Sequence, residues 1–285
     1  MKIGVCYNMF NPIFTCYGDD KFKKIKEFGF DTIDFGMTAT NTDLYLLPKE
    51  EADKLLIKEK ELIAQAGMSF SQVHGPWCWP PPETEKGGKE KRMEEMKRSL
   101  YNTSVLGVQY TVIHPIMPYF TEEKGTELEQ KTWEENIAFF KELAEYAREV
   151  GVTICIENMP MPDFSIATPK DIVKLVKEIN SENVKICLDT GHVGTYPDMS
   201  IKDAILCFGK DLKVLHVHDN LVGPDIHLMP YWGRLDWKEF IEGLKKIEFS
   251  GSVSCELIAP GKLPLEMRED YYRLVAKIAK HIVAQ

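Results

Sequence analysis

Histidines and carboxylates that end short apolar segments are the residues of this sequence best suited to chemistry. Six of them recur in that position: His74, His114, Glu157, Asp189, His218 and Glu256. Imidazole and carboxylate groups transfer protons, and together they also bind divalent cations. Several carboxylates in one confined site would repel one another, so a cation is expected to neutralise them. The residue types therefore predict a divalent metal site.

The alternation of apolar residues in these segments indicates where the polar side chains point. Successive side chains of a β-strand face opposite sides of the sheet. In TICIEN the two isoleucines form the outward, apolar set, so Glu157 points inward. The same test turns Asp189, His218 and Glu256 inward, and it places His216 one layer deeper, as a core histidine. The polar ends of the segments are therefore predicted to converge.

Apolar strand segments alternate with helical segments along the whole chain. Eight strands are predicted: IGVCYN near residue 3, TIDFG near 32, SFSQVHGP near 69, YTVIHP near 110, TICIEN near 153, VKICLDTGH near 184, LKVLHVHDN near 212 and SVSCELI near 252. Helices are predicted over 49–67, 126–151 and 264–285, the first two ending at Gly67 and Gly151. Eight such units predict an α/β fold, a (β/α)8 TIM barrel whose polar strand ends meet at its C-terminal mouth.

The length of the chain fits this barrel as a single domain over residues 1–285. A doubly wound open sheet is the structural alternative. Such a sheet usually has a Gly-rich phosphate-binding turn after its first strand, where YNMFNP stands here. The most irregular stretch, 76–92, is rich in proline and is interpreted as a long loop and a candidate lid.

Composition narrows the expected partners and location. Lys and Arg number 35 against 44 Asp and Glu, and the resulting net charge of -9 disfavours nucleic acid as a partner. The seven cysteines are odd in number and form no C-x-x-C pair, so no disulfide framework is indicated. No apolar run suits a signal peptide or a membrane span. We therefore expect a cytoplasmic protein without a membrane partner.

Short motifs at the predicted strand ends resemble those of the xylose isomerase-like TIM barrels. This superfamily includes sugar isomerases and epimerases (among them sugar phosphate isomerases), inosose dehydratases and endonuclease IV. The motifs are VHGP (73–76), VIHP (112–115), IEN (156–158), CLDTGH (187–192), HVHDN (216–220), DIH (225–227) with GRLDW (233–237), and CELI (255–258). The resemblance covers essentially the whole chain, and it implies an isomerase or epimerase of a sugar or sugar phosphate.

The ketose epimerases of this superfamily imply a role for each of several residues. By that resemblance, Glu157, Asp189, His218 and Glu256 hold a divalent ion, Mn²⁺, Co²⁺, Mg²⁺ or Zn²⁺. Glu157 and Glu256 also form the acid/base pair: one removes the proton beside the carbonyl, and the other returns a proton after a cis-enediolate has formed. The chain departs from that pattern at Pro224, where those enzymes usually have an arginine.

Contacts with a small sugar substrate are predicted for a further set of residues. His192 is expected to reach a substrate oxygen, and His74 and His114 to hydrogen-bond the substrate or a carboxylate. The aromatic residues of the mouth loops, Trp77, Trp79, Phe10 and Trp232, would either stack on the sugar ring or pack on the barrel rim. A homo-oligomer is implied only by analogy with the family.

Two other activities of the superfamily would use nearly the same residues. An inosose-type dehydratase would expel a hydroxyl group at the same site. A zinc-dependent phosphodiesterase like endonuclease IV would add His74, His114, His192, Asp225 and His227 as ligands of further metal ions. The net charge and the absence of Lys or Arg from residues 37–48 disfavour DNA, so sugar chemistry is the prediction.

Overall fold

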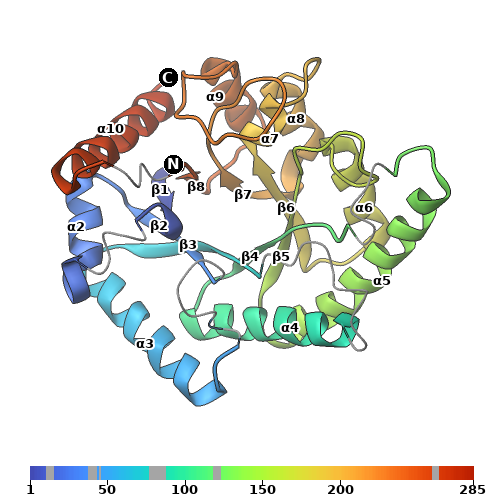
Figure 1. Cartoon of the computed structure of the whole chain (residues 1–285), viewed down its shortest axis with the longest axis horizontal. Helices are drawn as coiled ribbons and strands as arrows, with labels where there is room; N and C mark the ends of the chain where they lie inside the picture. Colours follow the sequence, from blue (N-terminus) through green and yellow to red (C-terminus); the bar gives the residue numbers. More distant parts are fainter. Residues whose placement is uncertain (11–15, 38–43, 45, 77–87, 118–122, 259–262) are drawn as a thin grey trace.

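The computed structural model describes residues 1–10, 16–37, 44, 46–76, 88–117, 123–258 and 263–285. Within them, parallel strands form one eight-stranded sheet surrounded by helices (Figure 1). The strands are β1 (Lys2–Cys6), β2 (Thr32–Gly36), β3 (Ser69–His74), β4 (Tyr110–Ile113), β5 (Thr153–Glu157), β6 (Val184–Asp189), β7 (Leu212–His216) and β8 (Ser252–Cys255). Neighbouring strands run in the order β7-β6-β5-β4-β3-β2-β1-β8.

The two ends of this sheet join just beyond β7. The backbone N–H of Val217 donates to the carbonyl of Ser254 at 2.7 Å, and the Val217 carbonyl accepts from the N–H of Glu256 at 3.0 Å. This parallel bridge between Val217 and Cys255 brings β7 beside β8. The predicted (β/α)8 barrel is therefore confirmed. Glu256, a predicted site residue, forms one of the two hydrogen bonds that close the barrel.

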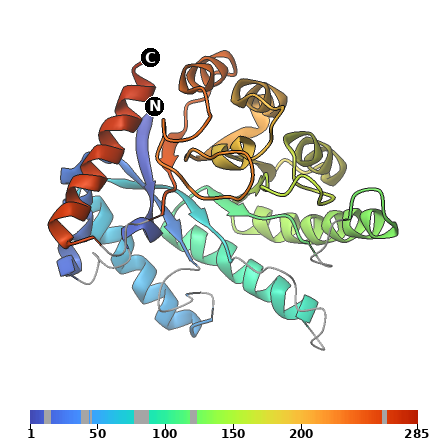
Figure 2. The same ribbon diagram turned by 45° about the horizontal axis from the view of Figure 1, so that its top comes forward.

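Helices cover the outside of the barrel, as a second view shows (Figure 2). They are α2 (Lys21–Phe28), α3 (Lys49–Gln65), α4 (Gly88–Leu106), α5 (Glu127–Glu149), α6 (Pro169–Ile179), α8 (Ile201–Phe208), α9 (Trp237–Lys246) and α10 (Leu265–Val283). Shorter turns, η1 (Tyr7–Phe10), η2 (Gly18–Asp20), α7 (Thr190–Gly194) and η3 (Gly209–Asp211), lie in the connections. None of the helices described here is long and apolar enough to cross a membrane.

Two predicted helix ends, at Gly67 and Gly151, agree with the structure, whereas the predicted end of the loop before α4 does not. Gly67 and Gly151 have φ of +65° and +71° after α3 and α5, the left-handed conformation that ends a helix. The predicted loop over 76–92 is wrong for its last five residues, because α4 begins at Gly88. The residues after Gly88, Lys-Glu-Lys-Arg, are good helix formers and extend the helix backward. Residues 77–87 lie outside the described part of the chain.

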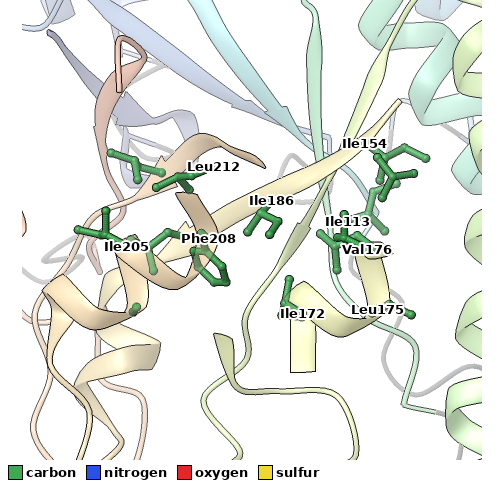
Figure 3. Close-up of a cluster of buried hydrophobic side chains, with 14 of the residues drawn as sticks. Ile113, Ile154, Ile172, Leu175, Val176, Ile186, Ile205, Phe208 and Leu212 are labelled. Carbon is green, nitrogen blue, oxygen red and sulfur yellow. The ribbon is translucent and has the colours of Figure 1, made fainter. Parts of the chain in front are cut away.

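The main apolar core lies between the barrel wall and the helices. Figure 3 shows Ile154 of β5 and Ile186 of β6 near apolar side chains of α6 and α8, such as Ile172 and Phe208. Inside the barrel, a separate small cluster consists of Val112, Cys155, Cys187 and Val214. Val112, Cys155 and Cys187 lie two positions before the predicted site residues His114, Glu157 and Asp189, and Val214 lies two positions before His216. The small side chains therefore fill the barrel below the polar layer at its mouth.

Candidate active site

The predicted site residues come from successive strands and lie at the C-terminal mouth of the barrel. Glu157 and Asp189 are the last residues of β5 and β6, and Glu256 directly follows β8. One ligand atom from each of these three residues and from His216 lies within 4.8 Å of the others. The first group of potential metal ligands is therefore Glu157, Asp189, His216 and Glu256.

Glu157 is almost completely buried, with 1% of its surface exposed. Its Oε1 accepts a hydrogen bond from Nδ1 of His216 at 2.7 Å. Its Oε2 lies 3.1 Å from Nε2 of His114 and 3.8 Å from Nε2 of His74, and it completes no hydrogen bond with the described residues. Burial alone would raise the pKa of Glu157, but His216 and His114 hold it well below its usual value. Glu157 is therefore an ionised carboxylate with one oxygen available to a cation.

Asp189 is fully buried and links the strand end to the following helix. Its Oδ1 accepts the backbone N–H of His192 at 2.8 Å and so caps the short helix α7. Nε2 of His218 lies 2.9 Å from Oδ1 and 3.0 Å from Oδ2 of Asp189. Burial opposes ionisation, but His192 and His218 lower the pKa of Asp189. The side chain amide of Asn158 fixes the backbone of Asp189 by bonding both its N–H and its carbonyl, at 2.9 and 3.0 Å.

A second group of potential ligands adjoins the first and consists of His192, His218, Asp225 and His227. Oδ2 of Asp225 lies 3.3 Å from Nε2 of His192 and 3.0 Å from Nε2 of His227. Despite burial, these two histidines hold the pKa of Asp225 far below its usual value. The acidic neighbours in turn outweigh burial and raise the pKa of His192 to about 10 and that of His227 to about 9. Within the second group, two histidines with raised pKa values, His192 and His227, thus flank the carboxylate of Asp225.

The geometry divides the predicted ligand set between the two groups. Glu157, Asp189 and Glu256 fall in the first group, whereas His218 falls in the second. Because Nε2 of His218 is 2.9 Å from Asp189, it stands at the boundary between the groups. His216, expected one layer deeper, is fully buried but reaches the carboxylates of the first group.

Two neighbours in the CLDTGH motif fix the position of His218. The hydroxyl of Thr190 donates to the carbonyl of His218 at 2.6 Å and accepts from its N–H at 3.0 Å. A Cβ added at Gly191 would lie only 1.9 Å from Cε1 of His218. The imidazole therefore occupies space that only glycine leaves open.

The loop after β7, which carries Asp225 and His227, is organised by the buried carboxylate of Asp219. Its Oδ1 accepts the N–H of Leu235 at 3.1 Å, and its Oδ2 accepts the N–H of Tyr231 at 3.0 Å. The indole N–H of Trp237 donates to Oδ2 at 3.1 Å. One buried side chain thus connects the loop to the start of α9.

Asp34, in the middle of β2, is a site residue that the sequence analysis did not identify. It is fully buried, and its Oδ2 accepts from Nε2 of His216 at 2.9 Å and from Nε2 of Gln72 at 3.1 Å. The alternation test would have found it, because Ile33 and Phe35 are the outward pair of TIDFG. The sequence feature that could have identified Asp34 is its carboxylate between two apolar residues of a predicted strand.

The aromatic residues predicted at the mouth differ in their positions. Phe10 is fully buried and packs against Tyr272, with ring centroids 4.4 Å apart, so it belongs to the core and not to a sugar-binding surface. The reason is that η1 turns Phe10 toward α10 directly after β1. Trp232 is 63% exposed. Trp77 and Trp79 lie outside the described residues.

Comparison with known proteins extends over nearly the whole chain. It is 27% identical to the D-psicose 3-epimerase of Ruminiclostridium cellulolyticum over 264 residues, which are 90% of this chain and 83% of the relative. It is 28% identical to the inosose isomerase of Bacillus licheniformis over 199 residues, 68% of this chain and 66% of the relative.

Solved structures share the fold. The crystal structure of the IOLI protein with a bound zinc atom superposes with a TM-score of 0.75, at 21% identity over 100% of this chain and 98% of the other. The sequence profile of one family, described as Xylose isomerase-like TIM barrel, matches residues 22–278. The chain therefore belongs to the xylose isomerase-like TIM barrel family.

Proposed function

We propose that this chain is a metal-dependent isomerase or epimerase of a sugar or sugar phosphate. One observation carries the proposal: carboxylates from β5 and from the end of β8 meet at Nδ1 of His216, Glu157 at 2.7 Å and Glu256 at 3.1 Å. Carboxylates held this close can act on the same carbon of one substrate. The similarity to a D-psicose 3-epimerase and an inosose isomerase supports this chemistry.

The donor set fits a divalent cation. Glu157, Asp189 and Glu256 bring three carboxylates within 4.8 Å, and Oε2 of Glu157 completes no hydrogen bond among the described residues. Such a cluster favours a cation, because like charges at this distance repel one another. We propose Glu157, Asp189, Glu256 and His218 as its ligands, and Mn²⁺, Co²⁺, Mg²⁺ or Zn²⁺ as the ion. When bound, the ion would polarise the substrate carbonyl and the adjacent hydroxyl.

The two glutamates divide the proton transfers between them. Glu157, whose pKa is lowered despite burial, is the ionised base that removes the proton from the carbon beside the carbonyl. Loss of that proton leaves a cis-enediolate. Glu256, whose side chain is 21% exposed, takes up a proton from solvent and returns it to the opposite face in an epimerase or to the neighbouring carbon in an isomerase, while the abstracted proton leaves Glu157 for solvent. His192, His74 and His114 are proposed to bind the substrate oxygens.

Proton exchange from solvent tests this function directly. The purified protein, loaded with Mn²⁺ or Co²⁺, is incubated in heavy water with a panel of free and phosphorylated ketoses, and the products are analysed by NMR. Deuterium at the carbon beside the carbonyl, together with a new epimer or aldose, is the expected result. If an inosose instead loses water without exchange into recovered substrate, the protein is a dehydratase.

The second ligand group favours one further candidate, a zinc-dependent phosphodiesterase. His192, Asp225 and His227 lie close enough to hold another ion, as a multi-metal phosphodiesterase requires. The net charge of -9 opposes a DNA substrate. About three zinc ions per chain, with cleavage of an abasic-site oligonucleotide and no ketose exchange, would replace the isomerase proposal with this one.

A further inference from the structure

We propose that Asp34 and His216 form a buried positioning unit that holds the two glutamates of the reaction in place. This inference rests on the proposed function and adds to it a carboxylate from β2 that does not touch the substrate. The unit runs in a line from Gln72 through Asp34 and His216 to Glu157 and Glu256.

Hydrogen bonds join Gln72, Asp34, His216 and Glu157, and an ion pair with His216 adds Glu256. Nε2 of Gln72 donates to Oδ2 of Asp34 at 3.1 Å and to the carbonyl of Leu215 at 3.1 Å. Oδ2 of Asp34 also accepts from Nε2 of His216 at 2.9 Å. On the other side of the ring, Nδ1 donates to Glu157 at 2.7 Å and lies 3.1 Å from Oε2 of Glu256. Each ring nitrogen thus faces a carboxylate.

Burial makes this arrangement rigid. Asp34 and His216 are both fully buried, and Glu157 is 1% exposed. The ring of His74 stacks on that of His216 at 5.4 Å between centroids, with 5° between the planes. Because no water can replace a lost partner at these depths, a rotation of His216 would leave charged groups unpaired. The imidazole is therefore held at both nitrogens and across its face.

The consequence for the reaction lies mainly in Glu256. Among the described residues, His216 forms the one ion pair within 4 Å of its carboxylate, at 3.1 Å. Glu256 follows the end of β8 and its side chain is 21% exposed, so the direction of its carboxylate depends mainly on this ion pair. Misplacement of a reacting group by about 1 Å costs on the order of a hundredfold in rate. Asp34 therefore acts through His216 on the spacing of the two glutamates, as a positioning residue.

Three variants test this unit: Asp34→Asn, His216→Asn and the double variant. Asn has nearly the shape of Asp and can still accept from His216, but it lacks the charge. For Asp34→Asn we expect kcat for ketose exchange to fall about 10- to 100-fold with KM changed less than about threefold. Because Asp34 acts only through His216, the double variant should be no slower than His216→Asn. Asp31→Asn, which removes a half-exposed carboxylate just before β2, is the matched control and should match wild type.

Proton NMR of the His216 imidazole tests this unit independently of activity. In the metal-free protein, the N–H protons of His216 should appear far downfield in the proton NMR spectrum and exchange slowly, because both face carboxylates in the interior. Asp34→Asn should shift both resonances, including that of the Nδ1 proton bonded to Glu157, while the Asp31→Asn spectrum stays unchanged. Mn²⁺ affinity should weaken about tenfold in Asp34→Asn.

The outcomes separate this inference from the proposed function. If the wild type shows no ketose exchange, the proposed function fails, and the NMR shifts still test the unit. Asp34→Asn with both resonances in place, or with kcat and Mn²⁺ affinity within twofold of wild type, would overturn the positioning role. Effects of Asp34→Asn and His216→Asn that simply add would also overturn it, since Asp34 would then act by another route.

Discussion

Each carboxylate of the site is held by histidines, and this determines its chemistry. Glu157 contacts His216 and His114, Asp189 contacts His218, and Asp225 contacts two further histidines. Despite burial, neighbouring histidines lower the pKa values of Glu157, Asp189 and Asp225, so these carboxylates stay ionised. The same histidines leave one oxygen of Glu157 without a hydrogen bond. Glu157 therefore has both properties that the reaction needs: it is an ionised base, and one of its oxygens is available to a cation.

Replacement of either glutamate by glutamine should abolish most of the proton exchange. Glu157→Gln and Glu256→Gln each remove an acid/base group, a loss on the order of 10²- to 10⁴-fold in kcat. The measurement is deuterium incorporation into the ketose substrate, compared with Glu149→Gln at the exposed end of α5. Either variant exchanging at the rate of Glu149→Gln would remove that glutamate from the acid/base pair.

Gly191→Ala should displace His218. The new methyl group would lie 1.9 Å from the imidazole, so the ring must move away from Asp189. We expect a loss of about 1–3 kcal/mol in stability from overpacking and metal affinity weakened about tenfold or more.

Gly243→Ala is the matched control for this variant. Its Cβ would meet the side chain of Ile205 at 3.1 Å, between α8 and α9 and away from the mouth. It should lower the melting temperature without changing metal affinity by calorimetric titration. Equal metal affinity in both variants would show that His218 takes no part in binding the ion.

Among the secondary-structure elements, those with apolar alternation were the most predictable from the sequence. The alternation that turns Glu157 and Asp189 inward also turns Cys155 and Cys187 inward, two positions earlier, and these cysteines form the inner cluster with Val112 and Val214. It did not reveal which inward residues share a layer, because layer height depends on the register between strands. For that reason His216 was interpreted as a core histidine, although it contacts the carboxylates of the site.

Loops were less predictable, because long-range contacts determine their course. The guanidinium of Arg234 donates to the carbonyls of Gly194, Tyr196 and Pro197, which come from the connection after β6. Nothing in the local sequence of either loop indicates this pairing. The approach of Asp225 to His192 depends on such contacts and could be inferred only from the family resemblance.

Asp219→Ala should affect both the stability and the site, because this side chain organises the loop after β7. The substitution leaves the indole N–H of Trp237 and the backbone N–H groups of Tyr231 and Leu235 without their acceptor. The expected cost is about 3 kcal/mol or more, or roughly 6–12 °C in melting temperature. Activity should fall as well, since the loop carries Asp225 and His227.

Asp236→Ala provides the comparison for Asp219→Ala. Asp236 caps α9 by accepting from the N–H groups of Lys238 and Glu239 at 2.9 and 3.0 Å. Its loss should cost about 1 kcal/mol, or roughly 2–4 °C, with activity retained. If both variants keep full activity in the exchange assay, the loop does not contribute to the site.

Over the whole molecule, the site depends on closure of the barrel. Glu157 and Glu256 come from strands separated in the wall by β6 and β7, and Glu256 N–H takes part in the bond that closes the seam between β7 and β8. The carboxylates are therefore brought together only in the folded chain. A cation that binds all of them would bind the native state and have no comparable site in the unfolded one.

Metal binding should therefore raise the stability of the whole molecule. At a free ion concentration about 100 times the Kd, mass action adds about 2.7 kcal/mol, which corresponds to roughly 5–10 °C in melting temperature. The experiment is differential scanning calorimetry of protein treated with a chelator and then supplied with Mn²⁺ or Zn²⁺. In Glu256→Gln the shift should shrink, because one proposed ligand is lost, whereas Asp31→Asn should keep it. Identical melting temperatures with and without these ions in the wild type would contradict a metal site at the mouth. A second stabilising step with Zn²⁺ that is lost in Asp225→Asn would assign an ion to the second ligand group.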